Sequence, residues 1–136
     1  DNFYSSGSVG LDTFYGGAGI DYFRIRPEFS ATTFDLVGGT VQTGSTTSLI
    51  SGIENFEGSQ NNDVFIGDAA DNRFMGNDGN DSLQGGGGND ILDGGAGNDT
   101  ISGGTGSDVF AFVTGDGSKR NINASWYQCR NRLRSK

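Results

Sequence analysis

Large apolar residues recur at every ninth position between Gly58 and Ala111, against a background of glycine, asparagine, aspartate and small polar residues. The segment divides into six units, which read GSQNNDVFI, GDAADNRFM, GNDGNDSLQ, GGGGNDILD, GGAGNDTIS and GGTGSDVFA. The first position is always glycine, the sixth is Asp or Asn, and the eighth is Phe, Leu or Ile. A fixed period of this kind predicts a repeat architecture.

Each unit combines a turn with a short strand. Glycines at the first, second and fourth positions suit a backbone that turns sharply or adopts positive φ, so the first six residues predict a turn. The last three place one apolar side chain between variable ones, which predicts a short strand with one inward residue. Two units then form one coil of 18 residues, and successive coils stack strands in parallel about 4.8 Å apart. Phe65, Leu83 and Ile101 are expected to line one sheet, and Phe74, Leu92 and Phe110 the other.

The same stacking brings sixth-position side chains together. The expected neighbours are Asp63 with Asp81, Asn72 with Asp90, Asp81 with Asp99, and Asp90 with Asp108. Stacked carboxylates repel each other, whereas carboxylate and glycine carbonyl oxygens are the ligands that Ca²⁺ prefers. The four pairs predict about four intercoil calcium sites, of which the Asn72 site is the weakest unless Asp68 or Asp71 compensates.

Two earlier units, 7–15 and 16–24, carry the same register and form an expected first coil, with Phe14 and Phe23 pointing inward. Their calcium partners must come from the segment that follows, 25–57, or from an upstream segment, because adjacent units lie on opposite sides. The predicted metal ligands are the side chains of Asp12, Asp21, Asp63, Asn72, Asp81, Asp90, Asp99 and Asp108, and the backbone of Gly76, Gly79, Gly85, Gly87, Gly94, Gly97, Gly103 and Gly106.

A flexible linker rich in Gly, Asn and Asp is the alternative to a folded repeat. A linker has no reason to place an apolar residue at every ninth position. The six units resemble the RTX, or haemolysin-type calcium-binding, nonapeptide β-roll found at the carboxyl end of secreted Gram-negative bacterial proteins. Its hosts include proteases, lipases, toxins, alginate epimerases and adhesins. The resemblance implies an all-β parallel β-roll, a right-handed β-helix solenoid with calcium ions between stacked turns, which folds on Ca²⁺ after type I secretion.

Composition agrees with a fold that apolar burial alone does not hold. The chain has 136 residues, of which 25 are glycine and 32% are hydrophobic. All 17 acidic residues lie in 1–118 with three arginines, giving that part a net charge of −14. Cations are therefore better partners than nucleic acid or anionic membranes. A single cysteine excludes a disulfide scaffold, and no apolar run is long enough for a transmembrane helix. The resemblance to the RTX family further implies an extracellular location, with the type I secretion machinery as a partner.

The remaining segments depart from the period. Residues 25–57, the insert, contain Phe34–Val37 and Thr40–Gln42 around Gly38–Gly39, which read as two short strands around a turn. We expect wider coils on the same axis within one domain, 1–113; a protruding binding loop with Thr43–Ser48 exposed is the alternative. Ile53–Glu57 reads as a degenerate unit. Phe112–Val113 are expected to extend the last strand, and the basic tail, 114–136, to be disordered or to form an improvised cap.

Catalytic motifs are absent from the sequence. The chain has no histidine, so zinc sites of the HExxH type and Ser-His-Asp triads are excluded, and no nucleophile elbow or P-loop is present. The regular spacing of the carboxylates marks ligands rather than an acid and base pair. We expect a calcium-binding module that is not itself an enzyme. The alternatives are a polysaccharide- or surface-binding module, using Val64, Ile66, Ile91, Val109 or the insert, and the carboxyl end of a secreted enzyme.

Overall fold

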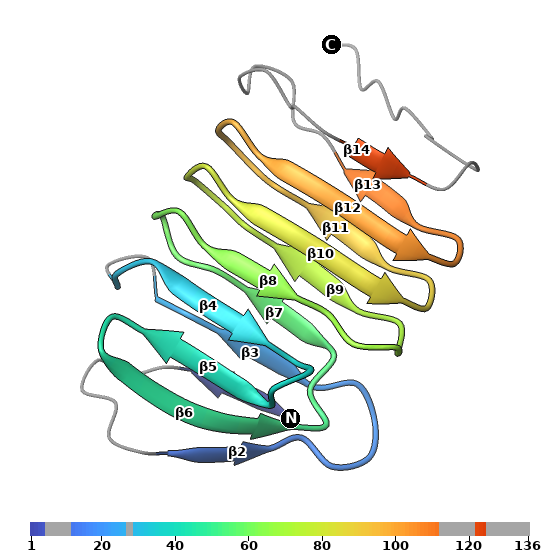
Figure 1. Ribbon diagram of the computed structural model, residues 1–136. Coiled ribbons are helices and arrows are strands. Elements are labelled where there is room, and N and C mark those ends of the chain that lie inside the picture. The colour runs from blue at the N-terminus through green and yellow to red at the C-terminus, as the bar shows by residue number, and fades with distance from the viewer. Residues whose placement is uncertain (5–11, 27–28, 112–121, 125–136) are drawn as a thin grey trace, which may run out of the picture.

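Two sheets of short strands face each other along the length of the molecule (Figure 1). The computed structural model describes residues 1–4, 12–26 and 29–111, and the backbone of 122–124. The chain alternates between the sheets, so that successive strands of the regular block belong to opposite layers. No helix occurs among the described residues, and none there is long and apolar enough to cross a membrane. The all-β prediction is therefore confirmed.

Among the described residues, the first sheet is parallel throughout and has six strands. Its order is β1 (Asn2–Tyr4), β3 (Tyr22–Arg24), β7 (Asn55–Glu57), β9 (Arg73–Met75), β11 (Ile91–Asp93) and β13 (Val109–Ala111). The register advances by 18 residues per layer in the regular block, as in the pairing of Phe74 with Leu92 and of Leu92 with Phe110. The predicted pairing of alternate units is thus confirmed, and Ile53–Glu57 does supply a strand that carries the solenoid into the block.

The second sheet has eight strands in the part of the chain that the structure describes. Its order is β14 (Ile122–Ala124), β12 (Thr100–Thr105), β10 (Ser82–Gly87), β8 (Val64–Ile66), β4 (Thr32–Asp35), β5 (Thr40–Thr43), β6 (Thr46–Ser51) and β2 (Thr13–Tyr15). Strands β10 and β12 pair beyond the predicted three residues, through Gly86 with Gly104 and Gly87 with Thr105. In these layers the glycine-rich half of the unit is therefore partly strand rather than turn.

The insert differs from the expected wider coils. Strands β4, β5 and β6 form an antiparallel meander that lies in the second sheet between β8 and β2. The segment shares the axis of the roll, but it widens one sheet instead of winding around both. The hairpin around Gly38–Gly39 forms as predicted, with Gly39 at φ 65°. At the tip of the next hairpin Gly44 and Ser45 are exposed, whereas Ser48 is buried.

One inward side chain from each layer builds a thin core, as the period predicts. Phe65, Phe74, Leu83, Leu92 and Ile101 are at most 1% exposed. The core is aromatic next to the insert, where Phe34 stacks on Phe65 with ring centroids 4.6 Å apart. Toward the carboxyl end it becomes aliphatic at Leu83, Leu92 and Ile101, before Phe110 in the last described layer. Burial of each such side chain contributes about 1.5 to 3 kcal/mol to folding.

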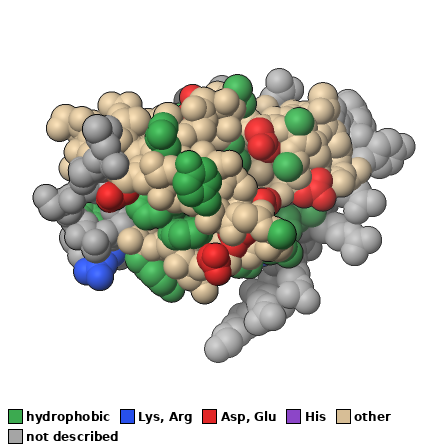
Figure 2. Space-filling view, turned by 90° about the horizontal axis from the view of Figure 1, so that it is seen from below, with side chains coloured by type: hydrophobic (Ala, Val, Ile, Leu, Met, Phe, Trp, Pro, Cys, Tyr) green, Lys and Arg blue, Asp and Glu red, His purple; other side chains and the backbone are tan. Residues whose placement is uncertain are grey.

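The two ends of the described roll differ. Apolar side chains lie uncovered on the face seen in Figure 2, which looks at the end that carries β2. At this end Tyr15 is 70% exposed and Leu49 is 54% exposed. At the other end, β14 pairs in parallel with β12. Part of the basic tail is thus a strand on the last coil. The rest of the tail, together with the predicted strand extension at Phe112–Val113, lies outside the described residues.

Candidate metal sites in the stacked turns

Sixth-position side chains form two buried columns, one beside each sheet. Those of the regular block are no more than 6% exposed. The backbone N–H of each donates to the carboxylate one coil further on: Asp63 to Asp81 Oδ1 at 2.8 Å, Asn72 to Asp90 Oδ1 at 2.8 Å, Asp81 to Asp99 Oδ1 at 3.0 Å, and Asp90 to Asp108 Oδ1 at 3.1 Å. The four pairs predicted from the period are therefore neighbours in the structure.

The second carboxylate oxygen of several of these residues has no partner. Asp21 Oδ2, Asp81 Oδ2 and Asp90 Oδ2 are buried and accept no hydrogen bond from the described residues. A buried carboxylate oxygen without a donor is strongly unfavourable unless a proton or a cation compensates for it. The three oxygens therefore fit a bound cation.

Carbonyl oxygens converge on the same space. A Cβ added at Gly76 would overlap Asp81 Oδ2 and lie 2.6 Å from the Gly94 carbonyl oxygen. The next unit repeats this arrangement, because a Cβ at Gly85 would overlap Asp90 Oδ2 and lie 2.6 Å from the Gly103 carbonyl oxygen. Each of these spaces, called a cradle below, combines a carboxylate oxygen with a carbonyl oxygen of the next coil. It exists only because the first residue of the unit, Gly76 or Gly85, lacks a side chain. Hard oxygen donors of this kind suit Ca²⁺.

The fourth-position glycines are Gly79, Gly88, Gly97 and Gly106, with φ between 95° and 140°. Gly87, which was predicted as a backbone ligand, is not one of them. Gly87 lies at the third position, has no positive φ, and its nearest external atom is Thr105 Oγ1, 3.3 Å from an added Cβ. Gly88 takes the equivalent role, since its Cβ would lie 2.5 Å from the Ala70 carbonyl oxygen.

The two ligands predicted in the first coil lie in different settings. Asp21 is buried, and its N–H donates to Glu54 Oε2 at 3.1 Å, so a carboxylate from residues 25–57 lies beside it. Asp12 is exposed, and its carbonyl accepts from Leu49 N at the edge strand β2. The structure therefore does not bring Asp12 into either buried column.

The fifth position carries a second ladder that the sequence reasoning missed. Asn80 N donates to Asn62 Oδ1 and Asn98 N to Asn80 Oδ1, both at 2.8 Å. On the opposite side, Asn89 N donates to Asp71 Oδ1 at 2.7 Å and Ser107 N to Asn89 Oδ1 at 3.0 Å. The signal was present, because every unit has Asn, Asp or Ser at its fifth position. These bonds hold successive turns in register without a metal.

The sequence of these turns matches a known protein-family model. The RTX calcium-binding nonapeptide repeat model, of four copies, matches residues 6–24, 50–83 and 75–110, which together make more than half of the chain. The chain belongs to the RTX calcium-binding repeat family. The parallel β-roll and the binding of calcium follow from that membership and from the stacked sheets. The search of curated proteins found no match.

The RTX turns hold calcium differently from a site built of side chains. Among the described residues, no three His, Cys, Asp or Glu side chains gather as a metal cluster. The donor set here is a carboxylate oxygen together with backbone carbonyls, at Asp81 with Gly94 and at Asp90 with Gly103. When bound, Ca²⁺ supplies the positive charge that lets these stacked carboxylates be buried in their ionised form.

Burial raises the pKa of several aspartates in the two columns. Loss of solvation, with a smaller contribution from the neighbouring Asp63 and Asp99, raises the pKa of Asp81 to about 7. Loss of solvation, with Asp108 and Asp71 nearby, raises the pKa of Asp90 to about 6. The pKa of Asp63 is also raised by burial, although hydrogen bonds from Ser59 and Thr32 oppose the change. Without a metal, the folded turns therefore favour protonated carboxyl groups.

The raised pKa values predict how the stability of the calcium-free chain depends on pH. The folded pKa values of Asp81 and Asp90 lie above the ordinary value of 3.8, so the folded form binds protons that the unfolded form releases. Their stabilising contribution is complete below about pH 3.8 and is lost as the pH rises through about 6 to 7. Circular dichroism in chelator should show more β-structure near pH 5 than near pH 7.5.

The matched variants are Asp81→Asn and Asp90→Asn, in which the pH dependence should flatten because the titrating group is gone. Calcium should reverse the trend in the unmodified chain, since protons compete with the ion for the same oxygens. Greater β-content at neutral than at acidic pH, in the absence of calcium, would contradict the prediction.

Proposed function

We propose that this chain is a calcium-triggered folding module that stabilises or delivers a larger extracellular protein exported by a type I secretion system. The observation that supports it best is the burial of unpartnered carboxylate oxygens at Asp81 and Asp90 within a strongly acidic chain. Such oxygens oppose folding at neutral pH until a cation reaches them. Membership in the calcium-binding RTX family identifies that cation as Ca²⁺.

The mechanism follows from the difference in calcium between compartments. In a calcium-poor cytosol, the net charge of −14 on 1–118 keeps the chain extended and suited to passage through a channel. Extracellular modules bind Ca²⁺ with dissociation constants of about 10⁻⁴ to 10⁻³ M, so millimolar calcium outside the cell saturates them. Binding to the folded form alone then stabilises the coils by mass action.

Circular dichroism with and without calcium tests this proposal. At neutral pH in chelator the chain should give a spectrum with much less β-structure than the calcium-loaded form, and millimolar Ca²⁺ should restore the full β spectrum. Magnesium is the control, because its preference for compact octahedral coordination suits these carbonyl-rich turns poorly. A β spectrum that persists unchanged in chelator at neutral pH would rule the proposal out.

We also propose that the chain has no catalytic activity of its own, and that any enzyme activity belongs to another part of the parent protein. The lack of histidine and the even spacing of the carboxylates support this. The full coding sequence of the parent would test it by revealing whether a catalytic domain accompanies the repeats.

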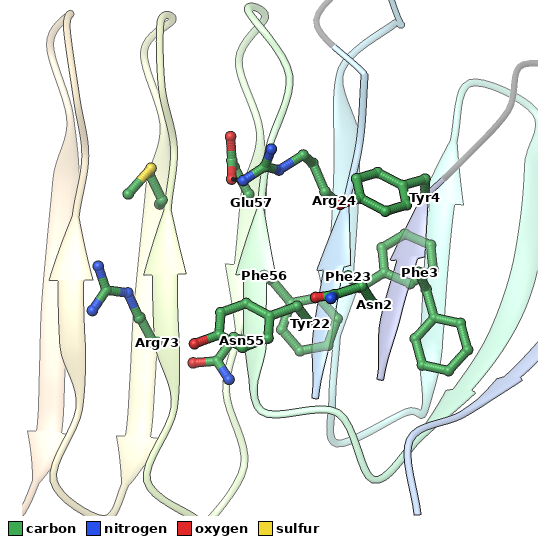
Figure 3. Close-up of a pocket in the computed structure, with 11 residues that line it drawn as sticks. Asn2, Phe3, Tyr4, Tyr22, Phe23, Arg24, Asn55, Phe56, Glu57 and Arg73 are labelled. Carbon is green, nitrogen blue, oxygen red and sulfur yellow. Dashed lines mark ion pairs between the residues drawn. The ribbon is translucent and has the colours of Figure 1, made fainter. Parts of the chain in front are cut away.

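Binding of a saccharide or a cell surface is the second candidate, and one groove favours it. The groove, of about 310 Å³, crosses the outer face of the six-stranded sheet from β1 to β9 (Figure 3). Tyr4 and Tyr22 in it are 57% and 48% exposed, and Arg24 reaches across to Glu57 with Nη2 and Oε2 2.5 Å apart. Exposed aromatic rings beside planar polar groups suit a sugar, which has both apolar faces and hydroxyl groups.

The outward residues predicted for this role, Val64, Ile66, Ile91 and Val109, do not line the groove. The test is binding of an oligosaccharide array by the calcium-loaded chain, with Tyr22→Ala compared with Tyr15→Ala, whose tyrosine lies on β2 in the other sheet. Loss of binding in the first variant alone would support the candidate, and equal binding by both would count against it.

A further inference from the structure

In the first turn of the regular block, 58–63, protein groups donate hydrogen bonds to both carboxylate oxygens of Asp63. We call such a turn closed, and a turn whose carboxylate keeps an oxygen without a donor open. Ser59 N donates to Asp63 Oδ2 at 2.7 Å, and the Ser59 hydroxyl donates to the same oxygen at 3.1 Å. The other oxygen, Asp63 Oδ1, accepts from Thr32 N at 2.6 Å. Three donors thus satisfy a carboxylate that is only 1% exposed. Hydrogen bonds from neutral donors to an ionised carboxylate stabilise its charge without a metal.

The gap between this turn and the next turn on the same side is also bridged by a side chain. Asn77 Nδ2 donates to the Gly58 carbonyl oxygen at 2.9 Å. Asn77 is the one non-glycine residue with positive φ, 76°, among the described residues. The amide therefore satisfies the carbonyl of a first-position glycine, the same position as Gly94 and Gly103, whose carbonyls face the cradles at Gly76 and Gly85. Asparagine tolerates this left-handed conformation better than most residues do.

The second turn is closed in a similar way. Asp68 N donates to Asn72 Oδ1 at 3.2 Å, and Asn72 Nδ2 donates back to Asp68 Oδ1 at 3.4 Å. Ala70 N also donates to Asp68 Oδ1, at 2.9 Å. Asn72 has no charge to neutralise, and Asp68 satisfies both ends of its amide. This is the compensation by Asp68 that the sequence left open, and it comes through hydrogen bonds.

The following two turns lack such closure. Positions two and three of 85–90 are glycines, and no described residue donates to Asp90 Oδ2. In 76–81 the second-position side chain, Asn77, points to Gly58 rather than to its own turn, and Asp81 Oδ2 likewise has no donor. The change from closed to open turns occurs between Asn72 and Gly76, within one continuous solenoid.

The core changes over the same part of the chain. Beside the closed turns, Phe34, Phe56, Phe65 and Phe74 pack on one another, with centroid separations of 4.6 Å to 6.0 Å. Beside the open turns the inward residues are Leu83, Leu92 and Ile101. Aromatic side chains bury more area and gain from ring contacts, so the layers next to the insert need less help from a metal.

We propose that the turns 58–63 and 67–72, docked on the insert 29–57, form a calcium-independent foundation, and that within the regular block calcium is bound only from Asp81 onward. Winding then proceeds from this foundation toward residue 111 as ions fill the Asp81 and Asp90 turns. The inference rests on the proposed function and refines it: two of the four predicted intercoil sites are occupied by Ser59, Asn77 and Asp68 instead of by ions.

Hydrogen exchange of the whole chain, with and without chelator at neutral pH, tests the foundation. Amides in β4, β8 and β9 should keep slow exchange in chelator, whereas those in β10 to β13 should lose it and regain it with Ca²⁺. Fast exchange throughout 29–111 in chelator would overturn the inference. Calcium-independent protection throughout that range would overturn both the inference and the proposed function.

Two variants at equivalent positions test where calcium binds. Asp81→Asn should lower the number of ions bound at saturation by about one per chain, as read by calorimetry, because it removes an unpartnered ligand oxygen. Asp63→Asn should leave that number unchanged, even if it destabilises the fold. An equal loss in both variants would overturn the inference while leaving the proposed function standing. If the unmodified chain binds no calcium, the proposed function falls and the inference falls with it.

Discussion

A Gly97→Ala variant should fold poorly even in saturating calcium. Gly97 has φ 140°, and a Cβ there would overlap the Gly79 carbonyl oxygen of the previous coil. The variant must therefore strain its own backbone and push two coils apart, at a combined cost on the order of 3 kcal/mol. That cost exceeds what one side-chain contact supplies in so thin a core. Thermal unfolding followed by circular dichroism in excess Ca²⁺ measures it.

Gly87→Ala is the matched control. Gly87 has no positive φ, and its nearest external atom is the terminal oxygen of Thr105, which can move aside. Its unfolding temperature should remain close to that of the unmodified chain. If the two variants were equally stable, or if Gly87→Ala were the less stable, the assignment of Gly97 and Gly88 to the fourth-position turn would be wrong.

Phe65→Ala should cost about 3 to 5 kcal/mol of folding free energy, which is comparable with the whole stability of many small domains. Phe65 is fully buried, and its ring stacks on both Phe34 and Phe74 with centroids 4.6 Å and 5.2 Å away. The variant would leave a cavity where the insert meets the regular block. Denaturant unfolding at fixed calcium concentration measures the loss.

Val109→Ala serves as its control, because Val109 is 47% exposed on the outer face of β13. Its effect should stay within about 0.5 kcal/mol, as for other surface substitutions. A Phe65→Ala variant as stable as Val109→Ala would show that the aromatic part of the core does not hold the insert to the roll.

The nine-residue period predicted the parts of the fold that repeat. It set the strand positions, the inward residues such as Leu83 and Leu92, and the offset of 18 residues between paired strands, because one sheet register satisfies all units at once. It also placed Asp81 beside Asp99. It did not predict the meander of β4, β5 and β6, since 33 residues without a period leave open whether a strand crosses to the other sheet or turns back.

The details of each turn depended on departures from the repeat. Ser59 lies at the second position, where the regular pattern has glycine, and its hydroxyl and N–H both donate to the Asp63 carboxylate. Asp12 fits the pattern, but it is exposed beside the edge strand β2 and lies in neither of the two buried columns. The run of four glycines from Gly85 to Gly88 obscured which of them turns, and the backbone angles assign that role to Gly88. Local composition alone did not reveal these differences, because they depend on which atoms the neighbouring coil presents.

Anomalous diffraction from crystals grown with Ca²⁺ shows directly whether calcium lies between the stacked turns. Anomalous peaks are expected about 2.3 to 2.6 Å from Asp81 Oδ2 and from Asp90 Oδ2. Well-ordered turns with both oxygens free of any metal peak, at saturating calcium, would contradict this prediction.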